Sequence, residues 1–496
     1  MELEGEVGLG ELRQCFRSGS TRSVSWRKAQ LEAILKLITD NEDKMFKALQ
    51  QDLGKHPDEA YRDEIGAVVK SANNSLSSVE KWMAPQKAIF QLLMMQFGQV
   101  RIPVLFFPAK GEVLPEPLGL ALIFSSWNFP ILSALDPLIG AISAGNAAVL
   151  KPSKLAPACS SFLANTIPLY LDNKAIKVIE GGADIAEKVL QQKWDKIFFT
   201  GSPRVGRIVM SAAAEHLTPV TLELGGKCPI ILDSLTNLSD IQAAVKRIAQ
   251  GKWGLCSGQP RIGIDYVLVE HKFASLLIDS LKRTMKKFYG DNPKSLNNLS
   301  RIVNKHHFDR LHNLLEDPNV GASIVHGGSL DEENLIIEPT ILLDPPLDAE
   351  IMTEEIFGPL LPIITLNKIQ DSIEFINSRP KPLTLYAFTK NEAFKKQILT
   401  ETSSDTLVFN DIFGQFLCDA LPFGGVGQSG IGRYHGKYSF ETFSHEKPVL
   451  HRSFFPDMEM LYPPLNDSKL QFLRLAYKFD NVGILLHFLG LKKTFT

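Results

Sequence analysis

The stretch LALIFSSWNFP, residues 120–130, indicates the fold, because a short buried apolar strand runs directly into a polar turn and a proline suited to the first turn of a helix. The same pattern recurs in NAAVLKPS (146–153) and KIFFTGSPRVG (196–206), with a further short strand at 176–179. Short β-branched apolar runs that alternate with helices predict a parallel sheet covered on both faces. We therefore expect an α/β nucleotide-binding domain before about residue 223.

A second α/β run follows this first one. Strands are expected at 229–232, 265–270, 323–325, 362–366 and 383–389, with helices at about 238–252 and 272–288. Upstream, apolar spacing predicts helices over 20–82. The prolines in 97–117 exclude a helix there, and VRIPVLFFP (100–108) is expected to be an extended edge strand or crossing arm. The segment 412–445 is rich in glycine and is expected to be irregular.

Composition places this 496-residue chain among ordinary globular proteins. Apolar residues make up 44% and the formal net charge is −2, so no bulk attraction to nucleic acid is expected. Five scattered cysteines form no C-x-x-C pair, which argues against a zinc site or a disulfide framework and favours a reduced compartment. The acidic first residues lack the features of a secretory signal, and we expect a cytoplasmic protein.

Chemistry-bearing residues follow the predicted strands. Lys151 lies at the carboxyl end of a strand, where open α/β sheets bind ligands, although a solvated lysine is equally compatible. The turn from Thr200 through Gly201 and Ser202 to Gly206 could bring backbone N–H groups to a phosphate. It lacks the Lys-Ser/Thr pair of a P-loop, so a plain β–α turn stays the simpler interpretation of this motif alone.

Three further positions have two interpretations each. Glu223 in LELGGK could act as a general base, and Asn128 in SSWNFP could stabilise an oxyanion; a salt-bridged glutamate and a turn-forming asparagine are the alternatives. Glu355 and Phe357 in EEIFGP could hold a ribose and pack on a ring, or simply form a packed loop.

These motifs together resemble the aldehyde dehydrogenase superfamily. SSWNFP, AGNAAVLKPS, FFTGSPRVGR, TLELGGK, EEIFGP and LPFGGVGQSGIGRYHGKYSFETFSH occur in the order of that family, and the last block resembles its class 3 branch, most of all the plant members. The resemblance implies an α/β fold with a Rossmann-like cofactor domain (1–96 and 118–222), an α/β catalytic domain (223–420), bridging segments for oligomerisation (97–117 and 421–450), and a homodimer.

The resemblance also implies the reaction: NAD- or NADP-dependent oxidation of an apolar aldehyde to its acid, with no metal. A cysteine attacks the aldehyde, Asn128 holds the oxyanion, and Glu223 activates the water that releases the acid. Around the cofactor, Lys151 binds the adenine-side ribose and Glu355 the nicotinamide-side ribose. The other residues expected to contact the cofactor are Ser153, Lys154, Thr200, Gly201, Ser202, Gly206 and Phe357.

The sequence departs from the family pattern at the nucleophile. The family motif G-Q-x-C reads Gly258-Gln259-Pro260-Arg261 here, so Arg261 occupies the cysteine position. Arginine is always protonated and cannot attack a carbonyl. Cys256, five residues upstream, lies too far along the chain to be an expected substitute. The chain is then an aldehyde dehydrogenase by ancestry, an inactive cofactor-binding or heterodimer-partner homologue, or an active enzyme carrying a single-base variant.

Two further features carry predictions. Lys154 replaces the glutamate that usually follows KPS, and a cation there favours the 2′-phosphate of NADP. The tail at 465–496 is expected to be helical, with an apolar stripe beside Lys492 and Lys493. Such a tail could associate peripherally with an intracellular membrane, or pack on the body or on a partner subunit.

Overall fold

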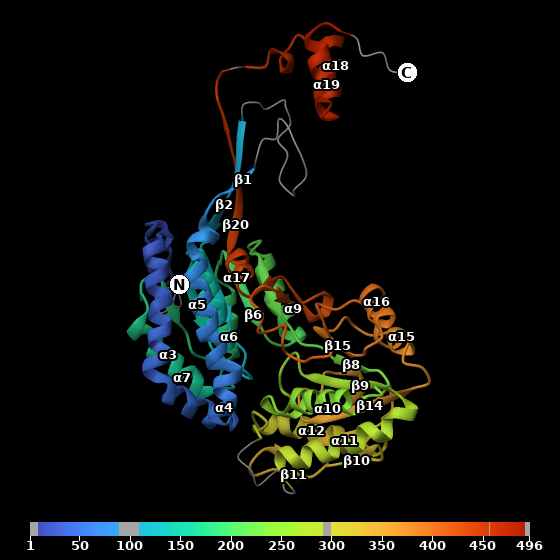
Figure 1. Ribbon diagram of the computed structural model, residues 1–496. Helices are drawn as coiled ribbons and strands as arrows, with labels where there is room; N and C mark the ends of the chain where they lie inside the picture. The colour runs from blue at the N-terminus through green and yellow to red at the C-terminus, as the bar shows by residue number, and fades with distance from the viewer. Residues whose placement is uncertain (1–7, 89–108, 291–298, 456, 492–496) are drawn as a thin grey trace. The chain divides into compact units, whose positions relative to one another are not determined.

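The computed structural model describes residues 8–88, 109–290, 299–455 and 457–491 (Figure 1). The chain forms two compact units. The first comprises residues 1–79 and 117–443, and the second comprises residues 80–116 and 444–496. The first unit contains both predicted α/β runs, and its architecture confirms the α/β fold class.

A six-stranded sheet occupies the predicted nucleotide-binding part of the chain. Its order is β18-β7-β6-β3-β4-β5, and the five strands from β7 to β5 are parallel. The chain passes from β3 to β4 and β5 on one side and then returns to β6 on the other side of β3. In open α/β sheets, ligands commonly bind at such a point, beyond the carboxyl ends of the strands. The strands are β3 (Leu120–Phe124), β4 (Ala147–Lys151), β5 (Ile176–Val178), β6 (Lys196–Thr200), β7 (Val220–Glu223) and β18 (Gly430–Ile431).

Helices bury both faces of this sheet, and α3, α6 and α7 pack side by side (Figure 1). The predicted helical stretch 20–82 is broken at Gly54, whose φ of 67° ends α3, and Pro57 then begins α4. The helices are α2 (Leu9–Arg17), α3 (Val24–Leu53), α4 (Pro57–Ala60), α5 (Gly66–Met83), α6 (Leu132–Ala144), α7 (Pro157–Tyr170), α8 (Ala183–Leu190) and α9 (Pro203–Ala214).

The second α/β run folds into a seven-stranded sheet of order β10-β13-β14-β9-β8-β15-β16, parallel except for β10. The predicted strands are confirmed to within two residues at each end. The strands are β8 (Cys228–Leu232), β9 (Ile264–Glu270), β10 (Ile324–His326), β13 (Thr340–Leu343), β14 (Leu360–Leu366), β15 (Thr384–Phe388) and β16 (Thr406–Phe409).

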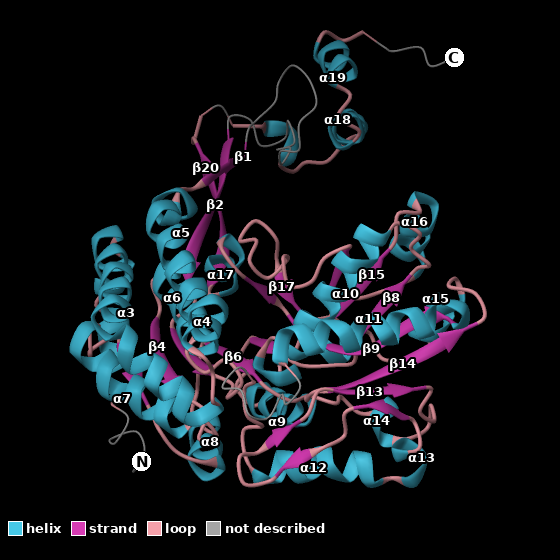
Figure 2. Cartoon of the chain, turned by 60° about the horizontal axis from the view of Figure 1, so that its bottom comes forward, coloured by secondary structure: helices cyan, strands magenta, loops and turns pink. Residues whose placement is uncertain are grey.

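Helices α10 and α11 pack against this sheet (Figure 2). Buried aliphatic side chains from β8, β9, β14 and the surrounding helices form one continuous core. The helices of this part are α10 (Leu238–Trp253), α11 (His271–Tyr289), α12 (Lys305–Glu316), α13 (Pro318–Gly321), α14 (Glu350–Thr353), α15 (Asp371–Asn377) and α16 (Glu392–Glu401).

The glycine-rich segment 412–445 joins the first unit. Its strand β18 pairs antiparallel with β7, with Gly430 opposite Glu223. Residues 421–443, which we grouped with the bridging segments, therefore lie with the six-stranded sheet in this structure. The short elements here are β17 (Phe423–Gly424), η6 (Gly427–Ser429), β19 (Arg433–Tyr434) and α17 (Lys437–Thr442).

The second unit contains a three-stranded sheet and a helical tail. The sheet has the order β1-β2-β20, formed by β1 (Gln86–Ala88), β2 (Ala109–Pro117) and β20 (Ser444–Arg452). β2 is the middle strand of this sheet, and β1 pairs only with Gly111–Val113, so Pro115 and Pro117 need no N–H on that side. The stretch 100–108, expected to be an extended edge strand or crossing arm, lies outside the described residues. The prolines Pro103 and Pro108 lie outside the described residues.

The tail forms α18 (Asp467–Tyr477) and α19 (Asn481–Phe488), as its apolar spacing predicts. Phe472, Leu475, Ala476 and Ile484 form a small buried cluster of their own. Lys492 and Lys493 lie outside the described residues. In the described part of the chain, no helix has both the length and the apolar content needed to cross a membrane.

Candidate active site

The candidate residues of the first sheet meet at one edge because their strands are parallel. Lys151, Thr200 and Glu223 are the last residues of β4, β6 and β7, and Thr200 lies opposite Glu223 in the strand register. Asn128 follows β3 by four residues, in the loop that leads to α6. The structure thus places these strand ends at one edge of the sheet, with Asn128 in the loop after β3.

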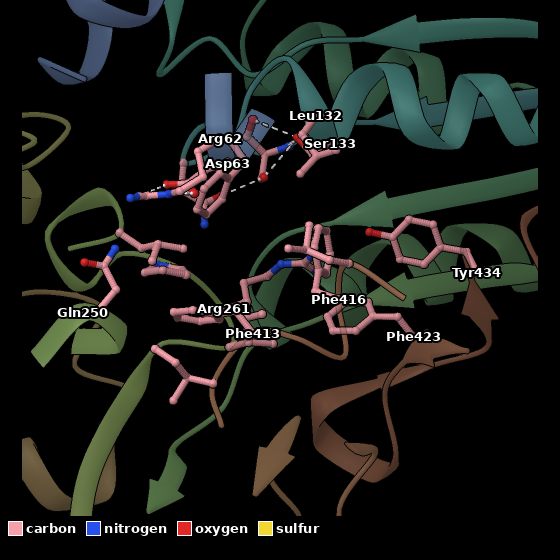
Figure 3. A pocket seen from close by; sticks show the side chains of 18 residues that line it. Arg62, Asp63, Leu132, Ser133, Gln250, Arg261, Phe413, Phe416, Phe423 and Tyr434 are labelled. Carbon is pink, nitrogen blue, oxygen red and sulfur yellow. Dashed lines mark hydrogen bonds and ion pairs between the residues drawn. The ribbon is translucent and has the colours of Figure 1, made fainter. Parts of the chain in front are cut away.

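A pocket of about 240 Å³ opens beside this edge (Figure 3). Asn128 and Arg261 both line it, and most of the remaining wall is aromatic or aliphatic. The apolar lining residues are Phe129, Leu132, Leu255, Pro260, Ile262, Ile412, Phe413, Phe416, Leu417 and Phe423. Its shape and lining suit an apolar small molecule with one polar group.

Glu223 lies beside Arg261, one of the lining residues, and its side chain makes no hydrogen bond. Its side chain is fully buried, and neither carboxylate oxygen has a hydrogen-bonding partner. Burial raises the pKa of Glu223 to about 8, and the nearby positive charge of Arg261 only partly offsets this effect. The carboxyl group is therefore mostly protonated at neutral pH.

Arg261 is the cation that faces Glu223. It lies in the loop between η4 (Cys256–Gly258) and β9, and its side chain is 13% exposed. Its guanidinium Nη1 is 3.6 Å from Glu223 Oε2 and makes no hydrogen bond. The two groups are thus in electrostatic contact, but neither satisfies the other's hydrogen-bonding capacity.

A strained turn and a buried amide position Arg261. Cys256 and Ser257 have φ angles of 43° and 47°, a left-handed backbone that non-glycine residues rarely adopt. The buried Gln259 closes this turn, because its Nε2 donates to the carbonyl of Cys256 at 2.8 Å. Asn128 Nδ2 in turn donates to the Gln259 carbonyl at 2.7 Å. Gln259 thus couples the Asn128 loop to the Arg261 loop, a role that its sequence position did not reveal.

Cys256 does not face the pocket. Its thiol lies 3.6 Å from the backbone carbonyl of Asn128 and packs with Leu53 and Val303. Burial raises the pKa of this thiol to about 12, so it is not ionised at neutral pH. Cys228 is likewise fully buried, as expected for a core thiol. No cysteine lines the pocket in the described part of the chain.

The two predicted cofactor lysines converge on one turn. Lys151 Nζ donates to the carbonyl of Gly181 at 2.8 Å, and a Cβ added at Gly182 would lie 3.4 Å from Lys154 Nζ. Burial, reinforced by the Lys154 charge, lowers the pKa of Lys151. Ser153 Oγ accepts a hydrogen bond from the N–H of Leu155, so it shapes the connecting loop. The turn after β5 is therefore flanked by two ammonium groups.

The turn after β6 is close to Glu223. The N–H of Gly201 donates to the Glu223 carbonyl at 3.0 Å, and a Cβ at Gly201 would lie 2.5 Å from the Phe199 ring. Ser202 caps α9 by accepting from the N–H of Val205. Gly206 allows α9 to approach Leu224, which a Cβ would meet at 2.8 Å. Both glycines are required by close packing.

Glu355 and Phe357 lie beside the turn that follows Glu223. Glu355 Oε1 accepts from the N–H of Gly226 at 3.1 Å, and a Cβ added at Gly225 would lie only 2.3 Å from Glu355 Oε2. Burial, together with the charge of Asp265, raises the pKa of Glu355 to about 8. The Phe357 ring packs edge-on against Trp127 at 5.3 Å.

Several pocket residues carry no signal in the sequence. Phe413, Phe416, Phe423 and Tyr434 come from the glycine-rich segment that we expected to be irregular. Only the number of aromatic residues in that segment could have suggested a wall. Among the described residues, no group of three or more His, Cys, Asp or Glu side chains is arranged to hold a metal ion.

Comparison with known proteins identifies relatives over almost the whole chain. The profile described as "Aldehyde dehydrogenase family" matches residues 12–449. The chain is 59% identical over 488 residues to aldehyde dehydrogenase family 3 member F1 of Arabidopsis thaliana, covering 98% of each chain. It is 40% identical to family 3 member A2 of Mus musculus, covering 96% of this chain and 95% of the mouse protein.

Among solved structures, the substrate-bound state of Staphylococcus aureus AldH is similar to this chain. The TM-score is 0.88 at 38% identity, over 95% of this chain and 98% of the bacterial one. A 22% identical structure, a glyceraldehyde-3-phosphate dehydrogenase from Methanocaldococcus jannaschii complexed with NADP, has a TM-score of 0.77. The second likeness concerns the fold alone.

Proposed function

We propose, because this chain belongs to the aldehyde dehydrogenase family, that it binds NAD or NADP together with an apolar aldehyde but lacks the thiol that begins aldehyde oxidation. Its relatives are aldehyde dehydrogenases of family 3, including plant members. Their activity is the NAD(P)-dependent oxidation of aldehydes to acids. The inactive, cofactor-binding homologue is our assignment for this chain.

The residues around the first sheet suit a dinucleotide. Lys151 and Lys154 supply positive charge for the adenine-side ribose and its phosphate, and Glu355 suits the hydroxyls of the other ribose. Gly201 and Gly225 let their turns approach the Phe199 ring and the Glu355 carboxylate, which a Cβ would meet. Ser153, Thr200, Ser202, Gly206 and Phe357 complete the proposed site. When bound, the dinucleotide supplies a hydride acceptor.

Other residues suit an aldehyde. The aromatic wall of the pocket buries an apolar chain, and Asn128 lies where its amide could face the carbonyl oxygen. Glu223 is poised to take a proton from water once it ionises. These roles are the ones that the family resemblance implies for the same positions.

The single observation that carries the inactive assignment is the place of Arg261. This residue lines the pocket with its guanidinium 3.6 Å from Glu223, and no cysteine of the described chain lines the same pocket. A guanidinium has no lone pair available to attack a carbonyl, so no covalent adduct can form. The Gln259-Pro260 pair also offers no N–H at residue 260.

The test is NAD(P)H formation at 340 nm from hexanal, measured with the natural chain and with Arg261→Cys. We expect no turnover by the natural chain and clear turnover by the variant, since loss of a catalytic nucleophile can cost about 10⁶-fold in rate. Arg283→Cys, on the exposed surface of α11, is the matched control and should stay silent. Comparable turnover by the natural chain and Arg261→Cys would overturn the assignment.

Two associations follow from the same proposal. The bridging segments at 97–117 and 421–450 would join two subunits as a homodimer, or join this chain to an active sister chain. The tail would contact a membrane surface peripherally, because α18 and α19 expose Leu470, Val482, Leu485 and Phe488 beside basic residues such as Arg474. Both arrangements are compatible with a cytoplasmic protein.

A further inference from the structure

The pocket contains one guanidinium nitrogen that no hydrogen-bond acceptor satisfies. Its other charged lining residues are Arg62 and Asp63, which form a two-point ion pair, and Arg62 also donates to the carbonyl of Gly254. Arg261 Nη1, in contrast, is buried and has no hydrogen-bond acceptor. The unsatisfied nitrogen is therefore Arg261 Nη1, although the Arg261 side chain also interacts with Tyr434, which lines the same pocket. Figure 3 shows Arg261 among the lining side chains.

Glu223 does not neutralise this cation at neutral pH. Its nearest oxygen stays 3.6 Å from Arg261 Nη1, beyond a hydrogen bond, and burial raises its pKa to about 8. A guanidinium stays protonated under all ordinary conditions. The pocket thus holds a positive charge beside a protonated, hydrogen-bond-donating carboxyl group. A buried cation without an anion is costly, so an anionic ligand gains by supplying the missing charge.

We propose that this pocket binds an apolar carboxylate, with the carboxylate against Arg261 and the hydrocarbon against the aromatic wall. This inference rests on the proposed function and names the ligand class of the same site: the acid, rather than the aldehyde, is the preferred occupant. A guanidinium matches a carboxylate in a two-point geometry that a neutral aldehyde cannot offer. Phe129, Phe413, Phe416 and Phe423 bury the chain of the ligand.

Protonated Glu223 supports the same ligand. A protonated carboxyl group donates one hydrogen bond, and an anionic carboxylate is a strong acceptor for it. An ionised Glu223 would instead repel the ligand and compete for Arg261. The arrangement of one guanidinium and one neutral carboxyl thus favours anions over neutral carbonyl compounds.

The experiment compares hexanoate with hexanamide, a neutral molecule of the same length, by isothermal titration calorimetry at pH 7. We expect the natural chain to bind hexanoate at least about tenfold more tightly, since a buried charge pair commonly contributes more than a factor of ten. Arg261→Met should remove this preference and leave the hexanamide affinity within about threefold. Arg283→Met, an exposed arginine on α11, is the control and should keep the preference.

The outcomes separate this inference from the proposed function. Equal binding of hexanoate and hexanamide by the natural chain overturns the carboxylate site, even if hexanal is not oxidised. Turnover of hexanal by the natural chain overturns the proposed function, even if hexanoate binds. NADPH binding, followed by fluorescence, reports whether Arg261→Met is folded; if it is not, the comparison of the two ligands on the natural chain still decides.

Discussion

The guanidinium of Arg261 and the carboxyl group of Glu223 lie 3.6 Å apart and share no hydrogen bond. They come from different sheets: Glu223 ends β7, and Arg261 precedes β9. Glu223 is fully buried and the Arg261 side chain is only 13% exposed, so the positive charge acts on the carboxyl group at short range. The proposed function and the proposed carboxylate ligand both depend on this pair.

Hexanoate binding should weaken as the pH rises from 7 to 9. Below its pKa of about 8 Glu223 is neutral, and above it the residue carries a negative charge that repels the ligand and pairs with Arg261. Four other titratable groups face Glu223. Burial raises the pKa of Asp136 to about 6 and also raises that of Asp405. Burial lowers the pKa of His435 to about 3 and raises that of Tyr434 well above its usual value.

Glu223→Gln tests this assignment. The variant should bind hexanoate with the same affinity at pH 7 and pH 9, as measured by calorimetry, because its amide does not titrate. A pH dependence that persists in Glu223→Gln would assign the effect to another group, such as Asp405.

Lys154→Glu should shift cofactor preference from NADP towards NAD. Lys154 Nζ lies at the turn of Gly181 and Gly182, close to the carbonyl contact of Lys151. Since a hydrogen bond to a charged group contributes ~1.5–3 kcal/mol, the ratio of the NADP and NAD dissociation constants should rise about tenfold or more. Lys188→Glu, exposed on α8, should leave the ratio unchanged. NAD binding tenfold more tightly than NADP to the natural chain would contradict the role of Lys154.

Gly225→Ala should weaken dinucleotide binding while leaving thermal stability nearly intact. The new Cβ would lie 2.3 Å from Glu355 Oε2, and the end of that flexible side chain can move away. Overpacking of this kind typically costs ~1–3 kcal/mol. We expect this cost to appear as a rise of about tenfold in the dissociation constant of NADPH. Gly10→Ala, which meets no atom within 4 Å, is the control. Unchanged NADPH affinity in Gly225→Ala would remove Glu355 from the cofactor site.

Lys55→Met should destabilise the first unit strongly. Lys55 Nζ donates to Glu64 Oε1 at 2.6 Å and to the carbonyl of Asn128 at 2.8 Å, and both side chains are fully buried. Removing one partner of a buried ion pair costs ~3–5 kcal/mol, so the urea midpoint from tryptophan fluorescence should fall clearly. Lys36→Met breaks the exposed pair with Asp40 and should hardly change the midpoint. Equal midpoints for the two variants would show that the buried pair adds no stability.

Removal of residues 470–496 should abolish flotation with vesicles that contain anionic lipid. The tail exposes apolar side chains from α18 and α19, and its small buried cluster folds within the tail itself. Flotation of the full chain and the truncated chain is compared at low and at physiological salt. Identical distributions of the two proteins would reject a membrane-binding tail.

The sequence alone determined the two parallel sheets and the edge at which Lys151, Thr200 and Glu223 meet. Buried apolar strands that alternate with helices admit few other arrangements, and residues at the carboxyl ends of parallel strands must share one edge. The order Gly258-Gln259-Pro260-Arg261 was also readable as a departure from G-Q-x-C, and for this reason we propose Arg261 at the nucleophile position. The place of residues 109–117 as the middle strand β2 was not readable, because pairing partners far along the chain are not encoded locally.

Only the tertiary structure decided what surrounds those residues. The lack of hydrogen bonds at Glu223, the contact with Arg261, the coupling through Gln259 and the aromatic wall from 412–434 all join segments far apart in sequence. A pKa depends on burial and on neighbouring charges in space, neither of which periodicity records. The sequence therefore determined which side chains stand at the site, and the packing of the chain determined their charge and their partners.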